Sequence, residues 1–290
     1  AGLATALAAV ARGLRVVLVE KSHRLGGATA AAVGDLWVPC NHLMPAAGLT
    51  DTPDAARAYM RFLSGGYALP AMTDAYLRAA PPALRDLEAS GVSFHLLRGL
   101  PDHYYPSAEG SSADGRMVEC APIPRAALGE WGARLEEGVH NEPGVSWADA
   151  IAWGGLGARA RWPEHELEAR RRDDLLAAGA GLVGHFLARL LAAGTPILAD
   201  TRLDRLITED GRVTGLDGPT HRIRARRGVV LATGGYEGNP DLVNRFEGLP
   251  DWMNIFPDSV TGDAMLLAGE IGAATWRVPN NLAMLVGYAI

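Results

Sequence analysis

The first twenty residues pass from a helical pattern to a short, continuously apolar run. Residues 3–11 are rich in Ala and Leu, which predicts a helix, and Gly13 stands where a helix commonly ends. Residues 14–20 are mostly apolar and partly β-branched without alternation, which indicates a parallel strand buried on both faces. A helix, a tight turn and a buried strand together predict the second half of a βαβ unit.

In the long middle region, helical patterns are separated by Gly, Pro and Trp. Residues 22–50 predict a loop because they are punctuated by Gly and Pro. Residues 98–163 show no clear period. We therefore expect residues 52–195 to form a helical and irregular excursion from the core domain. Helices are predicted over 52–63 (opened by Thr52-Pro53 as cap and first turn), 73–90, 164–174 and 175–193.

From Pro196 onward the pattern changes to short strands and turns. Residues 228–232 form a second continuously apolar run and predict another buried strand, and residues 261–271 predict a helix. The fold class is therefore α/β, with a parallel sheet, a β-meander and a helical excursion. Shorter strands are predicted over 197–198, 203–208, 212–216 and 221–225, with Asp210-Gly211 as a hairpin turn.

Composition narrows the class of protein. A length of 290 residues with 48% hydrophobic content suits one large domain or two modest ones. The formal net charge of −6 counts against a nucleic-acid partner, which needs a basic face. Cys40 and Cys120 make neither a disulfide framework nor a zinc site, and we expect no metal. With no signal peptide and no apolar run of about 20 residues, we expect a cytoplasmic protein without a membrane span.

The two ends of the sequence have no terminal character. The chain begins at Ala1 without Met and already inside a helical pattern, and it ends at Ile290 without a stop signal for its last element. We therefore expect a fragment truncated at both ends, with a first strand and first glycines lying before residue 1.

Gly2 and Glu20 stand at positions typical of dinucleotide binding. In such folds the last glycine of Gly-x-Gly-x-x-Gly lets the helix start pack against the sheet, and an acid ending the second strand accepts hydrogen bonds from ribose hydroxyls. Glu20 lies eighteen residues after Gly2, where this acid is expected. The alternative is an ordinary αβ unit with a glutamate at a strand end, because only half of the motif is present.

Further glycine segments expose backbone that can approach a cofactor. Gly26-Gly27-Ala28-Thr29 follows Glu20 closely, and its N–H groups and hydroxyl can bind phosphate. The alternative for this segment is a flexible loop. Gly34-Asp35 and Thr233-Gly234-Gly235 repeat the feature, and Thr261-Gly262-Asp263-Ala264 opens a predicted helix, with a simple capped helix as its alternative.

Taken in order, these segments resemble the FAD-binding domain of the fumarate reductase and 3-ketosteroid-Δ1-dehydrogenase flavoprotein superfamily. The resemblance covers nearly the whole chain, least clearly over 98–195, and LWVP and DHYYP bring it nearest the 3-ketosteroid dehydrogenase-like branch. It implies a Rossmann-like FAD-binding domain over 1–253 and the start of a substrate-capping domain over 254–290. The stretches that carry it are RGLRVVLVEKSHRLGGATAAAVGDLWVP, DTPDAARAY, DHYYP, RARRGVVLATGGYEGN and TGDAMLLAGEIGAA.

The resemblance implies bound FAD and assigns residues to it. Glu20 would bind the adenosine ribose with Lys21 beside it, and Leu203 would offer backbone groups to the adenine. Backbone around Gly34 and Asp35 would face the isoalloxazine edge. The other residues implied to contact the cofactor, from the pyrophosphate to the ring, are Gly2, Gly26, Gly27, Ala28, Thr29, Ala232, Thr233, Gly234 and Asp263.

The sequence also departs from the family pattern. Ala264 replaces the glycine at the fourth position of Thr-Gly-Asp-Gly, and Ala28-Thr29 stand in the loop where some relatives attach FAD to a His. We therefore expect non-covalent FAD. Relatives continue with a capping domain and a final FAD-binding segment, which these residues lack, so we expect the 290 residues alone not to turn over substrate.

The resemblance implies an FAD-dependent oxidoreductase acting on a CH–CH bond next to a carbonyl, with desaturation of a steroid-like small molecule as the main hypothesis. Such chemistry needs a base for the α-proton. Tyr104 and Tyr105 are the candidates, and two aromatics with wet hydroxyls are the alternative. The family's principal base and ketone-polarising groups would lie beyond Ile290. An external electron acceptor is implied. The alternatives are a fumarate-reductase-like reductase of enoate acids and a truncated, non-catalytic flavin-binding fragment.

Overall fold

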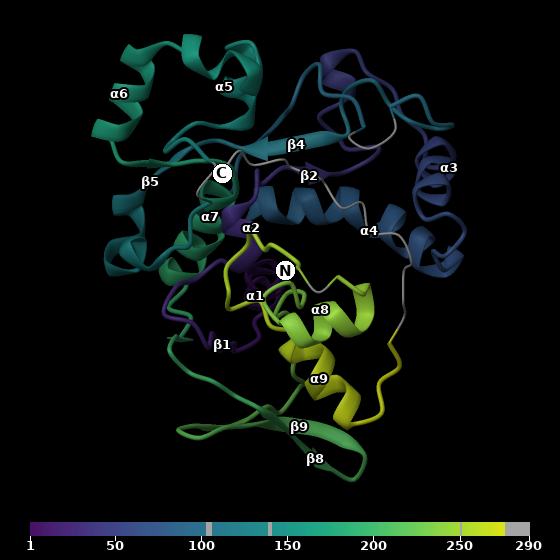
Figure 1. The fold of residues 1–290 in the computed structure, drawn as a ribbon, viewed down its shortest axis with the longest axis vertical. Helices are drawn as coiled ribbons and strands as arrows, with labels where there is room; N and C mark the ends of the chain where they lie inside the picture. The colour runs from purple at the N-terminus through teal and green to yellow at the C-terminus, as the bar shows by residue number, and fades with distance from the viewer. Residues whose placement is uncertain (103–105, 139–140, 250, 276–290) are drawn as a thin grey trace.

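The computed structural model describes residues 1–102, 106–138, 141–249 and 251–275 as a mixed α/β chain (Figure 1). Helix α1 (Gly2–Ala11) is followed by strand β1 (Leu18–Val19), which pairs in parallel with β7 (Ile197–Leu198). The predicted helix is confirmed, and the predicted strand over 14–20 is confirmed at two residues only. The parallel pairing of β1 with β7 brings the end of β1 beside a segment nearly 180 residues away in sequence.

The predicted strand over 228–232 is wrong. Residues 228–232 have no strand assignment, and Val230 is 66% exposed. A parallel strand needs a neighbour to bond its N–H and C=O groups, and the only parallel ladder among the described residues is the two-residue pairing of β1 with β7. Among the described residues no strand pairs with this apolar run, and it is partly exposed.

The predicted β-meander is confirmed. Strands β8 (Arg205–Glu209), β9 (Arg212–Asp217) and β10 (Arg222–Arg224) form an antiparallel sheet in the order β10-β9-β8. Asp210 and Gly211 both have positive φ angles, of 50° and 73°, as a two-residue hairpin turn requires. The meander projects at the bottom of Figure 1, below the other elements.

The excursion contains the predicted helices and two sheets that the sequence did not predict. Thr52 caps α3 by accepting the Ala55 N–H at 3.2 Å, as expected. The predicted helices are α3 (Pro53–Leu63), α4 (Pro70–Ala89), α6 (Glu164–Arg172) and α7 (Ala178–Ala192), and α5 (Trp147–Ala152) was not predicted. The sheets are β2 (Leu36–Trp37), β4 (Met117–Cys120) and β3 (Phe94–Leu96) in the order β2-β4-β3, and β5 (Ile123–Pro124) with β6 (Leu175–Leu176).

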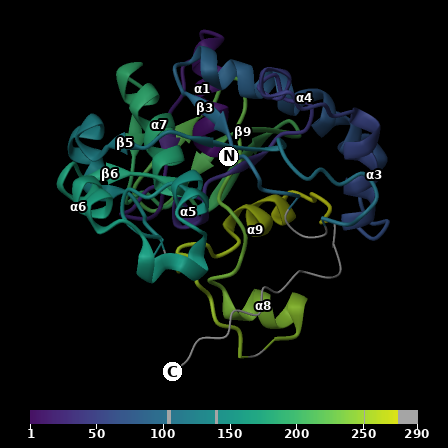
Figure 2. The same ribbon diagram turned by 90° about the horizontal axis from the view of Figure 1, so that it is seen from above.

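The remaining elements are short. They are α2 (Gly27–Ala31), α8 (Pro240–Glu247), α9 (Asp263–Glu270) and the 3-10 helices η1 (Pro45–Ala47), η2 (Arg125–Arg134) and η3 (Leu156–Arg161). Figure 2 shows α3 and α4 on one side and α5 and α6 on the opposite side, with α9 between them in that view.

Helix α7 is the centre of the hydrophobic core. Leu182, Phe186 and Leu190 pack with α1 and the β2-β4-β3 sheet, whereas Val183 and Leu187 pack with α2 and η2. A third cluster joins α5, η3 and α6, and its buried members are Val145, Ala150, Ala158, Trp162 and Leu167. Across the described ranges, each helix is too short or too polar to cross a bilayer.

Candidate functional site

Glu20 lies directly after β1 and is held by the strand's neighbours. Its N–H donates to the Leu198 carbonyl at 2.8 Å, and its carbonyl accepts the Thr201 N–H at 2.9 Å. The carboxylate accepts the Ser22 N–H at 2.8 Å. Burial raises the pKa of Glu20 above its ordinary value, against backbone hydrogen bonds that lower it. A half-buried carboxylate in this position suits a ligand with hydroxyl donors.

Lys21 and Asp263 meet at this strand end although 242 residues separate them. The Lys21 ammonium donates to Asp263 Oδ2 at 2.6 Å and to the Thr261 hydroxyl. The Thr261 hydroxyl donates to Asp263 Oδ1 at 3.0 Å. Burial alone would raise the pKa of Asp263, but the hydrogen bonds from Lys21 and Thr261 outweigh it and hold the pKa below its ordinary value.

Two more segments join this cluster. Arg202 approaches Asp263 at 3.7 Å, and the contact of its neighbour Leu203 with the adenine stays a prediction. The Ala264 N–H, in the first turn of α9, donates to the Thr233 hydroxyl at 2.9 Å. The structure thus gathers four of the residues chosen from the sequence: Glu20, Lys21, Thr233 and Asp263.

The start of α1 lies beside the apolar run that leads to Gly234. A Cβ added to Gly2 would lie 3.5 Å from the Cβ of Ala232. Helix α1 has neither an acidic residue in its first turn nor a side-chain cap. The N–H groups at the start of this ten-residue helix therefore suit an anion such as a pyrophosphate.

The segment expected to be a loop at Gly26–Thr29 is mostly the short helix α2. Gly26 and Gly27 have φ angles of +113° and +52°, which favour glycine, and no atom lies within 4 Å of the place where a Gly27 Cβ would stand. Ala28 and Thr29 lie on α2, which packs against α7 so closely that a Cβ on Gly179 would fall 1.9 Å from the Thr29 carbonyl. Open space beside Gly27 leaves room for a ligand.

Gly34 meets protein backbone. A Cβ there would lie 2.4 Å from the backbone of Ala178, at the start of α7, so packing alone requires a glycine at this position. The charge of the next residue, Asp35, acts on a buried glutamate of β4, Glu119. That the backbone here faces an isoalloxazine ring stays a prediction.

Sequence reasoning missed Glu119. Its side chain is fully buried, and it accepts the N–H groups of Trp147 at 2.7 Å and Ala148 at 3.0 Å, at the start of α5. Burial raises the pKa of Glu119 to about 7, against the two backbone hydrogen bonds. No sequence signal marks this residue, because a single glutamate in a short segment without a clear period looks like a surface residue.

Sequence reasoning also missed a buried charge network centred on Arg116. The guanidinium bonds both oxygens of Asp51, at 2.7 and 2.9 Å, and Asp102 at 2.7 Å, and all three side chains are at most 3% exposed. Asp102 also accepts the Trp37 indole N–H at 2.7 Å. A signal did exist, because Asp51 and Asp102 open the stretches DTPDAARAY and DHYYP.

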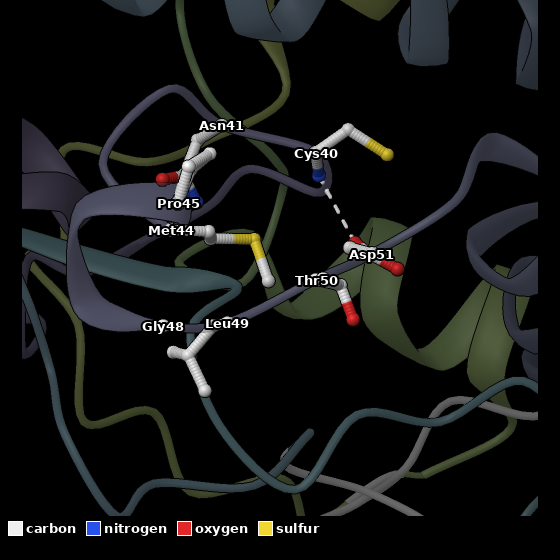
Figure 3. Close-up of a pocket in the computed structure, with 8 residues that line it drawn as sticks. All are labelled: Cys40, Asn41, Met44, Pro45, Gly48, Leu49, Thr50 and Asp51. Atoms are coloured by element: carbon white, nitrogen blue, oxygen red, sulfur yellow. Dashed lines mark hydrogen bonds between the residues drawn. The ribbon is translucent and has the colours of Figure 1, made fainter.

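A pocket of about 440 Å³ lies in the loop that leads to Asp51 (Figure 3). The Cys40 N–H donates to the Asp51 carboxylate at 3.0 Å across its rim, and burial raises the pKa of the Cys40 thiol. None of the predicted cofactor residues lines this pocket, so it is separate from the cluster at Glu20. Its lining residues are Cys40, Asn41, Met44, Pro45, Gly48, Leu49, Thr50 and Asp51.

Tyr104 and Tyr105, the candidate catalytic residues, lie outside the described residues. Among the residues that the structure describes, no three His, Cys, Asp or Glu side chains gather closely enough to hold a metal ion.

The described residues fit a dinucleotide. The half-buried Glu20 carboxylate suits a ribose, the uncapped start of α1 suits a pyrophosphate, and open space lies beside Gly27. Residues 232–234, which end the apolar run near α1, are exposed and can approach a flat ligand.

Comparison with known proteins agrees with this geometry. A family described as "FAD binding domain" matches residues 1–287. The chain is 32% identical to 3-oxosteroid 1-dehydrogenase of Mycobacterium tuberculosis, over 94% of this chain and 53% of that protein. It is 34% identical to 4-oxocyclohexanecarboxylate 2-dehydrogenase of Sinomonas cyclohexanicum, over 97% of this chain and 51% of that protein.

A solved structure is also similar. The 3-ketosteroid delta1-dehydrogenase of Sterolibacterium denitrificans, in complex with 1,4-androstadiene-3,17-dione, superposes with a TM-score of 0.79 at 28% identity. The match covers 94% of this chain and 53% of that one. The chain thus spans about half the length of the relatives that it matches.

Proposed function

The chain belongs to the FAD-binding domain family, and we propose that it supplies the dinucleotide-binding part of a dehydrogenase that desaturates a C–C bond next to a ring ketone. The observation that carries this proposal is the 32% identity to 3-oxosteroid 1-dehydrogenase over 94% of the chain. The cluster at the end of β1 supports it, because the acid, the helix start and the exposed backbone belong to one edge of the fold.

In this proposal each segment at the end of β1 binds a different part of FAD. The Glu20 carboxylate accepts the ribose hydroxyls, and the backbone at Leu203 lies beside the adenine. The start of α1 at Gly2 and the backbone of α2 at Gly26, Gly27, Ala28 and Thr29 bind the pyrophosphate and ribityl chain. Backbone at Gly34, Asp35 and residues 232–234 lies along the flavin. FAD is bound non-covalently, since neither Ala28 nor Thr29 offers an imidazole.

Bound FAD would supply the two-electron acceptor for hydride from the carbon β to the ketone. This chain's task is to hold that cofactor and to exclude water from it. Removal of the α-proton needs a base, and a tyrosine serves when its neighbours lower its pKa from about 10. Tyr104 and Tyr105 are our candidates to line the substrate site, and an external acceptor then reoxidises the flavin.

The substrate class that we propose is a cyclic ketone, steroid-like in the first instance. The relative from Sinomonas cyclohexanicum is named for a smaller ring ketone, 4-oxocyclohexanecarboxylate, and is similarly close at 34% identity. Both enzymes are named for a substrate with a C–C bond next to a ring carbonyl. The two relatives therefore support the type of reaction better than they support the size of the substrate's ring. The reverse class, reduction of an enoate acid, is the competing outcome.

We also propose a division of the chain. Residues 1–253 form a Rossmann-like FAD-binding unit, with the excursion over 52–195 inserted in it, and residues 254–290 begin the segment that covers the substrate. A cytoplasmic location agrees with Cys40 and Cys120, both of which are free thiols.

The proposal is tested in two steps. The 290-residue chain is titrated with FAD, and binding is followed by the quenching of flavin fluorescence. The protein as its gene encodes it is then assayed with an artificial electron acceptor on 4-androstene-3,17-dione and on 4-oxocyclohexanecarboxylate. Acceptor reduction with either ketone supports the proposal. Reduction of fumarate-type acids with no ketone oxidation would replace it by the enoate reductase hypothesis.

A further inference from the structure

Lys21 is the sole lysine of a chain that holds 26 arginines. Its ammonium does not point to solvent, because its side chain is only 20% exposed and is engaged by Asp263 and by the Thr261 hydroxyl. An ammonium is a compact point charge, whereas a guanidinium is a planar fork, so the two are not interchangeable in a narrow site. The one position at which this sequence uses a lysine is thus a contact between two distant segments.

We infer that Lys21 is a positioning residue for the adenosine half of the cofactor. Through Asp263 it holds the start of α9 at the end of β1, next to Glu20, and so fixes the edge on which the ribose is bound. This inference rests on the proposed function, because it presumes that FAD occupies this edge.

The charges around Lys21 support this role. Lys21 lowers the pKa of Glu20 and Asp263 raises it, so Lys21 stands as the cation between two mutually repelling carboxylates. The remaining cation, Arg202, is 3.7 Å from Asp263 and 54% exposed, and solvent screens it more strongly. The Asp263 side chain is only 14% exposed. Without the ammonium, its negative charge and that of Glu20 would repel each other with less cationic charge nearby, and the start of α9 would be pushed away from β1.

Lys21 acts through Asp263 and not by binding phosphate itself. Two of its three N–H donors are taken, by Asp263 and Thr261. Both oxygens of Asp263 are taken as well, Oδ2 by Lys21 and Oδ1 by Thr261. In this proposal the pair shapes the ribose site from behind, while Glu20 contacts the ligand; direct binding of FAD by Asp263 stays a prediction.

The test compares Lys21→Met with Arg15→Met in the 290-residue chain. Arg15 is an exposed arginine in the approach to β1, so its variant removes the same charge from the same segment without touching the cluster. We expect Lys21→Met to weaken binding of both FAD and ADP at least tenfold and by similar factors, because the lost positioning concerns the adenosine half only. Arg15→Met should leave both dissociation constants within twofold.

Amide hydrogen exchange of the cofactor-free chain gives an independent readout. Lys21→Met should speed exchange in α9, over Asp263–Glu270, and leave α3, over Pro53–Leu63, unchanged, which a global loss of stability would not do. Equal FAD affinity of Lys21→Met and Arg15→Met, or unchanged exchange in α9, would overturn the inference. If the unsubstituted chain binds no FAD while exchange in α9 still separates the two variants, the proposed function fails and the anchoring of α9 by Lys21 stands.

A milder pair of variants covers the case in which Lys21→Met does not fold. Thr261→Val removes the hydroxyl that Lys21 and Asp263 share and keeps both charges, and we expect FAD and ADP to bind three- to tenfold more weakly. Thr261→Ser keeps the hydroxyl and should bind as the unsubstituted chain does. Equal binding by the valine and serine variants would contradict the role of the cluster.

Discussion

Glu119 makes the stability of this protein depend on pH in a direction opposite to that of most carboxylates. In the unfolded chain its proton is lost near pH 4.5, whereas in the folded protein burial keeps it until about pH 7. Between these values the folded state binds more protons than the unfolded state, so the free energy of unfolding falls as pH rises. The contribution is complete below pH 4.5 and is lost above about pH 7.

The magnitude follows from the shift. One pKa unit corresponds to about 1.4 kcal/mol, so a pKa of about 7 in place of 4.5 corresponds to about 3 kcal/mol. The side chain is fully buried, and solvent does not screen it. Glu119→Gln replaces the titrating group by a neutral one of the same shape, which still accepts one of the two N–H groups of α5. This variant should lack that pH dependence.

The assay is urea unfolding of the chain and of Glu119→Gln at half-unit steps from pH 4.5 to 8.5. The difference between their free energies of unfolding should shift by about 3 kcal/mol in favour of the glutamine variant as pH rises, with its midpoint between pH 5 and 7. Glu130→Gln, at an exposed position, is the matched control and should run parallel to the unsubstituted chain. A difference between Glu119→Gln and the parent that does not change with pH would refute the reasoning.

Four further predictions follow from other parts of the structure. Arg116→Met leaves two buried carboxylates without their cation and should lower the free energy of unfolding in urea by about 3–5 kcal/mol; a loss below 1 kcal/mol would contradict the buried network. Glu20→Ala removes charge-assisted hydrogen bonds to the ribose, worth about 1.5–3 kcal/mol each, and should raise the dissociation constant for FAD at least tenfold, whereas an unchanged constant would remove the ribose assignment. Thr52→Ala should cost about 1 kcal/mol in the same unfolding assay, and Thr52→Ser should restore most of it. Acid precipitation of the FAD-loaded protein should leave a colourless pellet, because yellow precipitate would mean covalent flavin.

The first αβ unit and the meander could be predicted from sequence because local signals specify them. A helix ended by Gly13, a β-branched run ended by Glu20 and a turn at Asp210-Gly211 are patterns that adjacent residues create. The β2-β4-β3 sheet has no such signal, since its strands are two to four residues long and its central strand carries Glu119. Such short strands are fixed by tertiary contacts and not by their own sequence.

The candidate site was predictable as a set of residues and not as an arrangement. Glu20, Lys21 and Asp263 were chosen separately for a cofactor, and only folding shows that Lys21 and Asp263 bind each other. For residues 228–232 the sequence predicted a strand that the structure does not contain. An apolar run becomes a buried strand only where a neighbouring strand is present. Tyr104 and Tyr105 stay predictions.

The network around Arg116 has a consequence for the order of folding. Its guanidinium and the carboxylates of Asp51 and Asp102 come from three separate positions outside the strands, and each charge is well hydrated in an unfolded chain. Burying any one of them before the others arrive is strongly unfavourable, because a lone charge loses its water without gaining a partner. The loop that ends at Asp51 and residues 106–116 are therefore expected to become ordered in one cooperative step, and to open together during native-state exchange.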